Sequence, residues 1–576
     1  MTMKRIFNIY KKLVLVAAVM LGTLMTSCTD YLTIIPPDKI VHEKFWQTKD
    51  EVNGMLATSY IKLISTDAIS RAIVWGEMRA DNMTFPANYD NTYKYIIEAN
   101  ILDDNSYAHW GVFYEAINYA NLVIEYAPMV VDRDPDFTEG DLNVVLGEMY
   151  AMRALCHFYL VRTFRDIPMA LAPAVNDADL PEYKQVHPIE ALKLILADIE
   201  RAEAPGMIME SGSFPKDKDD SNYGRITRNA VLALKADVCL WLAAFSTYYE
   251  GESDLVAAGD VQRYYDICIE SCQAVVDNMD RMFIEQNEGK PVINDYPYHL
   301  LVNEGRVEDI KKSKYSSVYS QIFGFKNSSE SILELQIDDA NARDNGGCRG
   351  IPTLYGVSAA SSKVIVPKKF LDMYKEDDLR KYSYTNLSPT ASGEELKNDI
   401  FIAKYTAQSS PAQDYRKSDS FDANWIVYRK TDVLLMMAEA LVAQPSATSE
   451  DLKSAFEIAR VINVRSRIDS TDIKEPLAEP SDLTTCLSIV LDERARELAF
   501  EGKRWYDLVR KALREKSTKD ILFVADKLTS NQDVLKSKMS SIDGLFFPIH
   551  IDEIRYNKNL KQNPAYFDED SSVEMN

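Results

Sequence analysis

The sequence predicts a mostly α-helical protein built from helix pairs, with a large irregular, partly β insertion packed against them. Three observations support this prediction. Apolar residues recur at the helical spacing i, i+3, i+4 and i+7 over much of the 576-residue chain. The helical segments form consecutive pairs that interleave Ala with larger apolar residues, as in tetratricopeptide units of about 34 residues. A stretch rich in Asn, Ser, Asp, Gly and Tyr interrupts these pairs.

The chain begins with a short basic and apolar segment. Four basic residues and no acid precede the apolar run "LVLVAAVMLGTLM". That run is shorter than the about 20 residues that cross a bilayer, and the pattern is typical of a secretory signal. Because Ser27 and Cys28 follow it, we expect a bacterial lipoprotein signal over residues 1–27, with Cys28 acylated. An ordinary secretory signal with an incidental cysteine is the alternative. Residues 28–44 would form an extended tether, and no later segment is expected to cross the membrane.

Four helix pairs are expected after the tether. Pro188 is placed as a first helical residue, and Thr448 with Asp451 as a capping box. The expected pairs are residues 45–64 with 107–126, 142–164 with 189–202, 227–248 with 261–276, and 425–441 with 452–467.

The largest interruption covers residues 278–422 and contains the strand-like runs "SILELQI" and "KVIVP". Long irregular insertions on a rigid scaffold usually carry function, so this region is expected to bind ligand. It divides the chain into an N-terminal helical region, residues 45–277, and a C-terminal helical region, residues 423–576.

Composition excludes several classes of function. A net charge of −23 argues against a nucleic-acid partner. Cys268 and Cys272 are expected to be buried free thiols, and His157 a satisfied core residue. The six histidines show no metal-ligand spacing, and no GxSxG, HExxH, P-loop or Rossmann pattern occurs. We therefore expect no cofactor, no metal and no catalytic residue.

The densest charge cluster is "DERARELAFEGKRWYD", residues 492–507. Its carboxylates could be read as a hydrolytic pair, which needs two carboxyls across a cleft and one raised pKa. Ion pairs along helix faces explain the same pattern without a substrate. We interpret the cluster as structural and keep hydrolysis as a minor alternative.

The first insertion, "VWGEMRADNMTFPANYDNTYKY", mixes aromatic rings with amides and charges. Sugar binding needs a flat apolar face for the ring and planar polar groups for the hydroxyls. The alternative is a loop packed on the helices, with its tryptophan as the anchor. The candidate ligand-binding residues are Trp75, Arg79, Asp81, Asn82, Tyr89 and, in the large insertion, Tyr355.

Several phrases, taken in order, carry a resemblance to a known family. They are "CTDYL" after the leader, "GEMYAMRALCHFYLVRTFRDIPMA", "YRKTDVLLMMAEAL", "LDERARELAFEGKRWYDLVR" and the ending "FFPIHIDEIRYNKNLKQNPAY". Together they resemble the SusD/RagB family of nutrient-uptake outer-membrane lipoproteins. Arg165 and Ala565 stand where the family usually has Gly.

The resemblance implies about four tetratricopeptide-like units and a non-enzymatic, surface-exposed binding protein anchored in the outer membrane. It implies a SusC-like TonB-dependent transporter as partner and an oligosaccharide as ligand. A peptide-binding or scaffolding tetratricopeptide lipoprotein is the alternative.

Overall fold

The computed structural model describes residues 45–175, 183–208, 224–286, 297–303, 317–337, 348–358, 360–387, 399–406, 416, 421–470, 473 and 475–566. Cys28 and the expected leader and tether lie outside these residues. Contacts divide the chain into one unit over Met1–Gln47 and a compact unit over Thr48–Asn576.

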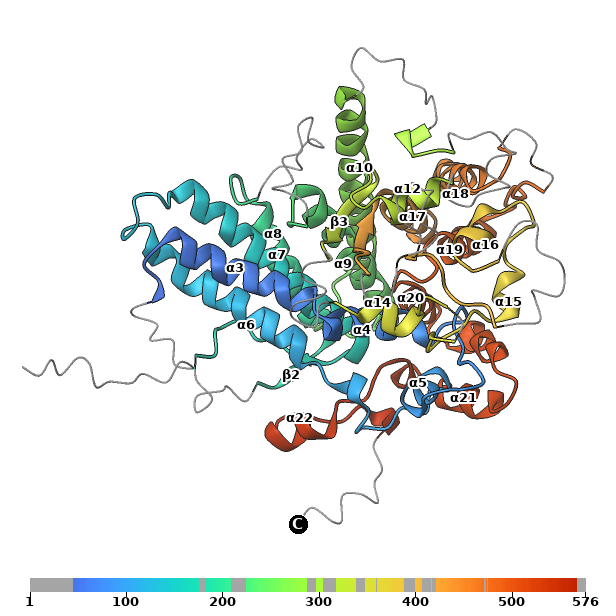
Figure 1. Ribbon diagram of the computed structural model, residues 1–576, viewed down its shortest axis with the longest axis horizontal. Helices are drawn as coiled ribbons and strands as arrows, with labels where there is room; N and C mark the ends of the chain where they lie inside the picture. The colour runs from blue at the N-terminus through green and yellow to red at the C-terminus, as the bar shows by residue number, and fades with distance from the viewer. Residues whose placement is uncertain are drawn as a thin grey trace, which may run out of the picture. The chain divides into compact units, whose positions relative to one another are not determined.

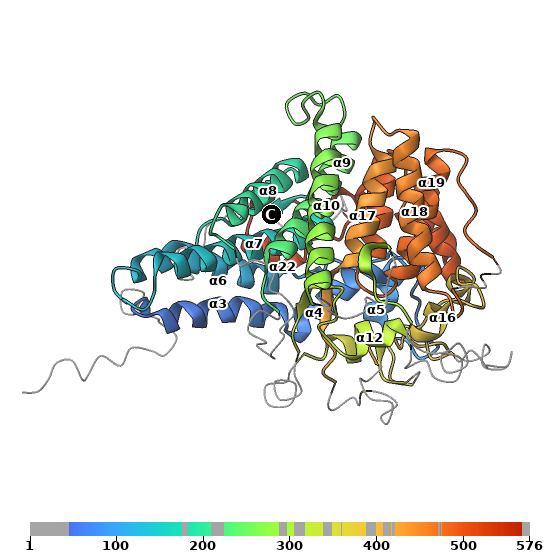
Figure 2. The ribbon, with the colours of Figure 1, turned by 90° about the horizontal axis from the view of Figure 1, so that it is seen from above.

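Four helix pairs form the scaffold of the compact unit, as the periodicity predicts. The second helix of each pair also packs on the first helix of the next, so the pairs follow one another in chain order (Figure 2). The pairs are α3 (Lys49–Leu63) with α6 (Gly111–Tyr126), α7 (Glu139–Phe164) with α8 (Pro188–Glu203), α9 (Arg228–Tyr248) with α10 (Asp260–Gln286), and α17 (Lys430–Ala443) with α18 (Ser449–Arg465).

Local signals set the helix ends. Pro188 is the first residue of α8. Thr448 and Asp451 form the predicted capping box at the start of α18. Arg165 ends α7 with a φ of +67°, a region that favours glycine, which explains why glycine is usual at this position. The ion pairs of Arg165 with Asp166 and Asp543 offset the cost of this backbone conformation.

The other helical elements, most of them shorter, lie around the pairs (Figure 1). They are α4 (Thr66–Ile73), the π-helix η2 (Val74–Met78), α5 (Asn91–Ile97), η3 (Ser106–Ala108), η4 (Ala127–Val130), η7 (Pro297–His299), α12 (Val318–Gly324), α14 (Gly350–Tyr355), α15 (Lys368–Leu371), α16 (Leu379–Ser383), α19 (Leu483–Glu497), α20 (Arg504–Arg514), η10 (Lys519–Lys527), α21 (Gln532–Lys538), η11 (Asp543–Leu545), α22 (Ile551–Tyr556) and η12 (Pro564–Tyr566).

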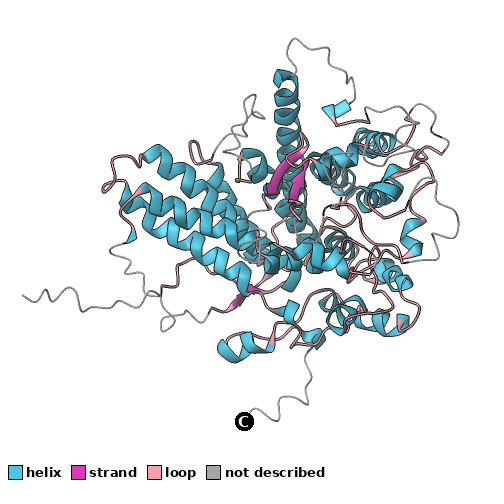
Figure 3. Cartoon of the chain, viewed as in Figure 1, coloured by secondary structure: helices cyan, strands magenta, loops and turns pink. Residues whose placement is uncertain are grey.

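Strands are few in the described part of the chain (Figure 3). β1 (Ile167–Pro168) pairs with β2 (Gln185–Val186), and β3 (Ser331–Leu335) with β4 (Trp425–Arg429), both antiparallel. β3 confirms the strand predicted in "SILELQI". The prediction of helix from residue 425 is wrong for β4, because its β-branched and aromatic residues are all buried and pair with β3. "KVIVP" contributes a single bridge, between Ile365 and Thr84.

Two helices, α7 and α9, are long and apolar enough to cross a membrane by length and composition. The expectation that no segment after the leader is long and apolar enough to cross a membrane is therefore wrong for α7 and α9. In each helix, however, 83% of the most apolar window is buried inside the protein. Both are core helices, and α7 also holds His157, whose Nδ1 donates to Arg153 O and whose Nε2 accepts from the Ala170 N–H. Cys268 and Cys272 are free and buried, as expected.

Candidate functional site

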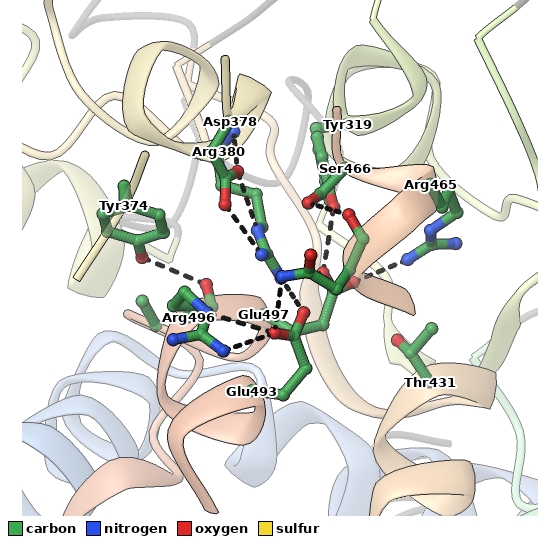
Figure 4. Close-up of polar contacts among 12 residues, drawn as sticks. Tyr319, Tyr374, Asp378, Arg380, Thr431, Arg465, Ser466, Glu493, Arg496 and Glu497 are labelled. Carbon is green, nitrogen blue, oxygen red and sulfur yellow. Dashed lines mark hydrogen bonds and ion pairs between the residues drawn. The ribbon is translucent and has the colours of Figure 1, made fainter. Parts of the chain in front are cut away.

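The charge cluster of α19 lies in the interior and centres on Glu497 (Figure 4). Its Oε1 accepts from Arg429 Nη1 at 2.8 Å and Arg465 Nη2 at 2.6 Å. Its Oε2 accepts from the Tyr319 hydroxyl at 2.9 Å and from Arg380 Nη1 at 3.1 Å. Burial alone would raise the pKa of Glu497, but the three guanidinium groups hold it well below its usual range.

Glu493, one turn before Glu497, extends the same network (Figure 4). Its Oε1 accepts from Arg380 at 2.6 Å, and its Oε2 accepts from Arg496 at 2.6 Å. Burial opposes ionisation, yet these two arginines keep its pKa below the usual value. A hydrolytic pair needs one carboxyl of raised pKa and access for substrate. Glu493 and Glu497 have neither, so the structure assigns them to a structural network.

Trp75 and Arg79, two of the predicted ligand contacts, are core residues. The Trp75 indole is fully buried, donates to the Tyr107 carbonyl at 2.9 Å and stacks on Phe113 at 5.1 Å. The Arg79 guanidinium is 1% exposed and lies over the ring of Trp505 at 4.4 Å. The packing-anchor interpretation of Trp75 therefore fits the structure, and the expectation of ligand contact is corrected for both residues.

Asn82 and Tyr355 are buried as well. Asn82 is fully buried and donates through Nδ2 to Glu77 at 2.6 Å. Tyr355 is 1% exposed, and its hydroxyl donates to the Phe500 carbonyl at 2.9 Å. Neither side chain has surface to present to a ligand, so the expectation that they bind one is corrected as well.

Tyr89 and Asp81 remain reachable from solvent. Tyr89 is 47% exposed and meets Phe85 edge to face at 5.3 Å. The Lys94 ammonium lies 5.4 Å from the Tyr89 ring centre and also faces Phe85 and Tyr95. These residues form an aromatic cluster in which Tyr89 is exposed and Phe85, Lys94 and Tyr95 are half-buried. Their role in ligand binding stays a prediction.

Asp81 helps to line a pocket of about 190 Å³ in the surface. Its carboxylate holds Arg504 through two bonds, Nε to Oδ1 at 2.9 Å and Nη2 to Oδ2 at 3.2 Å. Such a bidentate pair fixes the planes of both groups. The ring of Phe523, which is 40% exposed, lines the same pocket beside Phe370 and Met373.

The pocket carries little unpaired charge. Asp81 and Arg504 neutralise each other. Crowded, partly desolvated surroundings raise the pKa of Asp492, although its side chain still reaches solvent. Burial lowers the pKa of Lys527 to about 7, and its ammonium donates to the carbonyls of Met78 and Ala80. A rim of this kind favours uncharged polar ligands over strongly ionic ones.

The sequence indicated only one member of this pocket. Asp81, Phe370, Asp492 and Phe523 come from segments far apart in the chain, and only folding brings them together. Arg504 was assigned to the structural charge cluster, and the segment around Phe523 carried no motif. The sequence feature that could have indicated this part of the pocket is the large aromatic ring of Phe523 within a short amphipathic helical segment, η10.

Two family models match separate parts of the chain. The model described as "SusD family" matches residues 369–566, and the one described as "Starch-binding associating with outer membrane" matches residues 30–238. The chain is 26% identical over 521 residues to SusD-like protein P38 of Formosa agariphila, covering 88% of this chain and 92% of that protein. It is 25% identical over 292 residues to a SusD-like protein of Bacteroides ovatus, covering 49% and 48%.

Solved structures share the fold. A SusD homolog from Bacteroides thetaiotaomicron superposes with a TM-score of 0.65 at 18% identity, over 91% of this chain and 98% of that one. The surface glycan-binding protein A of the same species gives a TM-score of 0.59 at 16% identity, over 90% and 100%. The motifs, the helix-pair scaffold and both family matches agree, and the chain belongs to the SusD/RagB family.

Proposed function

We propose that this protein is a surface glycan-binding lipoprotein of the outer membrane that passes oligosaccharides to a TonB-dependent transporter. The family membership supports this proposal, as does the description of the matched family as starch-binding and associated with the outer membrane. The surface glycan-binding protein A has the same fold. The observation that carries the proposal for this chain is the pocket lined by Asp81, Arg504 and Phe523.

The chemistry of that pocket suits a sugar ring. The exposed face of Phe523 offers an apolar surface for the C–H side of the ring. The locked Asp81–Arg504 pair and Asp492 offer planar polar groups for hydroxyls. The volume, about 190 Å³, is below the about 300–1,000 Å³ that encloses a drug-sized ligand. The pocket would hold one sugar unit, with the rest of the oligosaccharide on the surface.

The test is glycan binding by variants of the exposed rings. Phe523→Ala and Tyr89→Ala remove stacking worth about 0.5–1.5 kcal/mol each, so each should weaken binding about twofold to tenfold. Calorimetry with the best glycan from an array measures the effect. Tyr556→Ala is the matched control, because Tyr556 is 85% exposed and belongs neither to the pocket lining nor to the rings of Phe85, Tyr89 and Tyr95 around Lys94. If the Phe523→Ala, Tyr89→Ala double variant binds as the parent does, the site assignment fails.

We also propose that the chain is not an enzyme and acts only together with its transporter. Glycans incubated with the purified protein should remain intact by chromatography. A TonB-dependent barrel should co-purify from outer membranes in mild detergent. Any hydrolysis by the purified protein would overturn the binding-only proposal, and its loss or survival in the Glu493→Gln variant would show whether the charge cluster is the active site.

Peptide binding is the second candidate, favoured by a groove of about 440 Å³ beside α3. Asn53 supplies an amide, and Leu56 and Ile61 supply apolar surface, while Arg225 lines the groove with its guanidinium paired to Glu148. An amide beside apolar surface suits an extended peptide. Binding to a peptide library but to no glycan, with loss in Asn53→Ala, would favour this candidate over the first.

A further inference from the structure

Two histidines from opposite ends of the chain stack on each other. His109 lies in the loop between η3 and α6, and His550 is the residue before α22. Their ring centres are 3.4 Å apart, with an angle of 21° between the ring planes. His550 is buried and His109 is partly exposed.

Two carboxylates from the first turn of α22 flank this pair. Glu553 Oε1 lies 3.3 Å from Nδ1 of His109. Asp552 Oδ2 lies 3.7 Å from Nδ1 of His550. One ligand atom each from His109, His550 and Asp552 lie within 4.8 Å of one another. Two nitrogen donors and one oxygen donor therefore converge on a small volume, and Glu553 lies beside it as the partner of His109.

We propose that His109, His550 and Asp552 bind a divalent transition-metal ion, with Zn²⁺ as the best match and a water molecule as its fourth ligand. Zinc accepts imidazole nitrogen and carboxylate oxygen in tetrahedral sites, at about 2.0–2.2 Å. Tetrahedral bonds of that length place neighbouring ligand atoms about 3.3–3.5 Å apart. Oδ2 of Asp552 lies 3.7 Å from Nδ1 of His550, a few tenths of an ångström beyond this value, and the two nearly parallel rings must turn so that both nitrogen lone pairs point at the ion. A calcium or magnesium site would need oxygen donors throughout.

The surroundings of His550 agree with a ligand role. Its imidazole also makes a hydrogen bond to the backbone of Asp104. Metal-bound histidines commonly donate their second ring nitrogen to a backbone carbonyl. Nδ1 faces Asp552 and accepts a long, 3.2 Å bond from its backbone N–H. A metal ion bound at Nδ1 would take the place of this hydrogen bond. Arg555 donates to the other carboxylate oxygen of Asp552 at 3.0 Å and keeps that side chain in position.

The metal would fasten the C-terminal part of the chain to the loop before α6. At present the Ile551 N–H, which donates to the Asp103 carbonyl at 3.0 Å, and the stacked rings make this connection. Binding of Zn²⁺ should therefore raise the thermal midpoint of the protein.

The test uses the full-length chain in detergent, stripped of metal with EDTA and titrated with ZnCl₂ in a calorimeter. The parent should bind one Zn²⁺ per chain, and Co²⁺ in its place should give the visible absorption of a tetrahedral site. His109→Gln and His550→Asn should each weaken binding at least about tenfold. Asparagine preserves the helix cap at position 550, and His109 caps no helix, so both variants should fold.

His187→Asn is the matched control. His187 also caps a helix, α8, where its Nδ1 accepts from the Ile189 N–H at 3.3 Å, but no second histidine stacks on it. This variant should bind Zn²⁺ as the parent does. The proposal is overturned if the parent shows no saturable binding, or if His109→Gln binds Zn²⁺ as tightly as the parent.

Discussion

Glu77 is a buried carboxyl whose protonation state differs between the folded and unfolded chain. It accepts from Asn82 Nδ2 at 2.6 Å and from the Gly502 N–H at 3.1 Å. Burial raises its pKa from 4.5 to about 8. Asn82 Oδ1 has no partner among the described residues. If the amide of Asn82 is turned, its Oδ1 faces Glu77, and a protonated Glu77 can donate a hydrogen bond to that oxygen.

Because the folded pKa of Glu77 lies above the unfolded one, its contribution to stability falls as the pH rises from about 5 to 8. The limiting slope is about 1.4 kcal/mol per pH unit. Glu77→Gln keeps the neutral shape and removes this slope. The difference between parent and variant urea midpoints should therefore shift in favour of the variant between pH 5 and pH 8. A difference that stays constant over this range would contradict the raised pKa.

Glu497 shows the opposite case, a buried carboxylate kept ionised by three arginines. Glu497→Gln removes the one carboxylate that the three guanidinium groups share, although each keeps a second acidic partner, and should cost about 3–5 kcal/mol. Glu457→Gln is the control, since Glu457 is 44% exposed and pairs with Arg460 on the surface of α18. It should change stability by less than about 1 kcal/mol. Equal urea midpoints for the two variants would show that the network contributes little.

At the scale of elements, the close contact between α7 and the turn that follows α8 depends on a glycine in α7. A Cβ on Gly147 would overlap the carbonyl oxygen of Met207, whereas a Cβ on Gly54, in the exposed face of α3, would meet nothing within 4 Å. Both glycines lie inside helices. The two positions therefore separate the effect of packing from the effect of helix propensity.

Gly147→Ala should destabilise the protein by about 1–3 kcal/mol, because the segment at Met207 must move away from α7. Gly54→Ala should stabilise it by about 0.5–1 kcal/mol, since alanine is the better helix former. Thermal midpoints of the two variants measure both effects. Shifts of the same sign would mean that the contact between α7 and Met207 adjusts without cost.

The helix pairs could be predicted from the sequence, because the spacing of apolar residues depends only on local geometry. β4 was missed, since a fully buried strand shows no alternation and resembles the start of the helix that follows it. The sequence of residues 74–95 does combine aromatic rings with amides and charges, and sugar binding by this segment stays a prediction. That composition could not reveal that Trp75, Arg79 and Asn82 point inward, or that Phe523 and Asp492 meet Asp81. Contacts of that range exist only in the folded chain.

At the scale of the whole molecule, the predicted anchor at Cys28 would hold the protein at a membrane although its apolar helices are buried. Both apolar helices, α7 and α9, are needed inside the core and are not free to insert. Two or more acyl chains on one cysteine suffice for stable attachment. The lipid would also raise the effective concentration of the protein over its transporter.

Cys28→Ala should therefore remain unacylated and appear in the soluble fraction, which fractionation and immunoblotting can measure. Cys348→Ala is the control, because Cys348 is a free, buried thiol and should leave localisation unchanged. Retention of the Cys28 variant in membranes of cells that lack the transporter would contradict the lipid anchor.

The network around Glu497 limits how this scaffold can be diversified. Arg380 and Tyr319 belong to the irregular region of residues 278–422, while Arg429 and Arg465 belong to the C-terminal helices, and all four bond to one carboxylate. A chimera that imports the irregular region from a relative without an arginine at position 380 would leave Glu493 and Glu497 short of a cation. New binding preferences can therefore be grafted onto this protein only in segments that leave these charge partners in place.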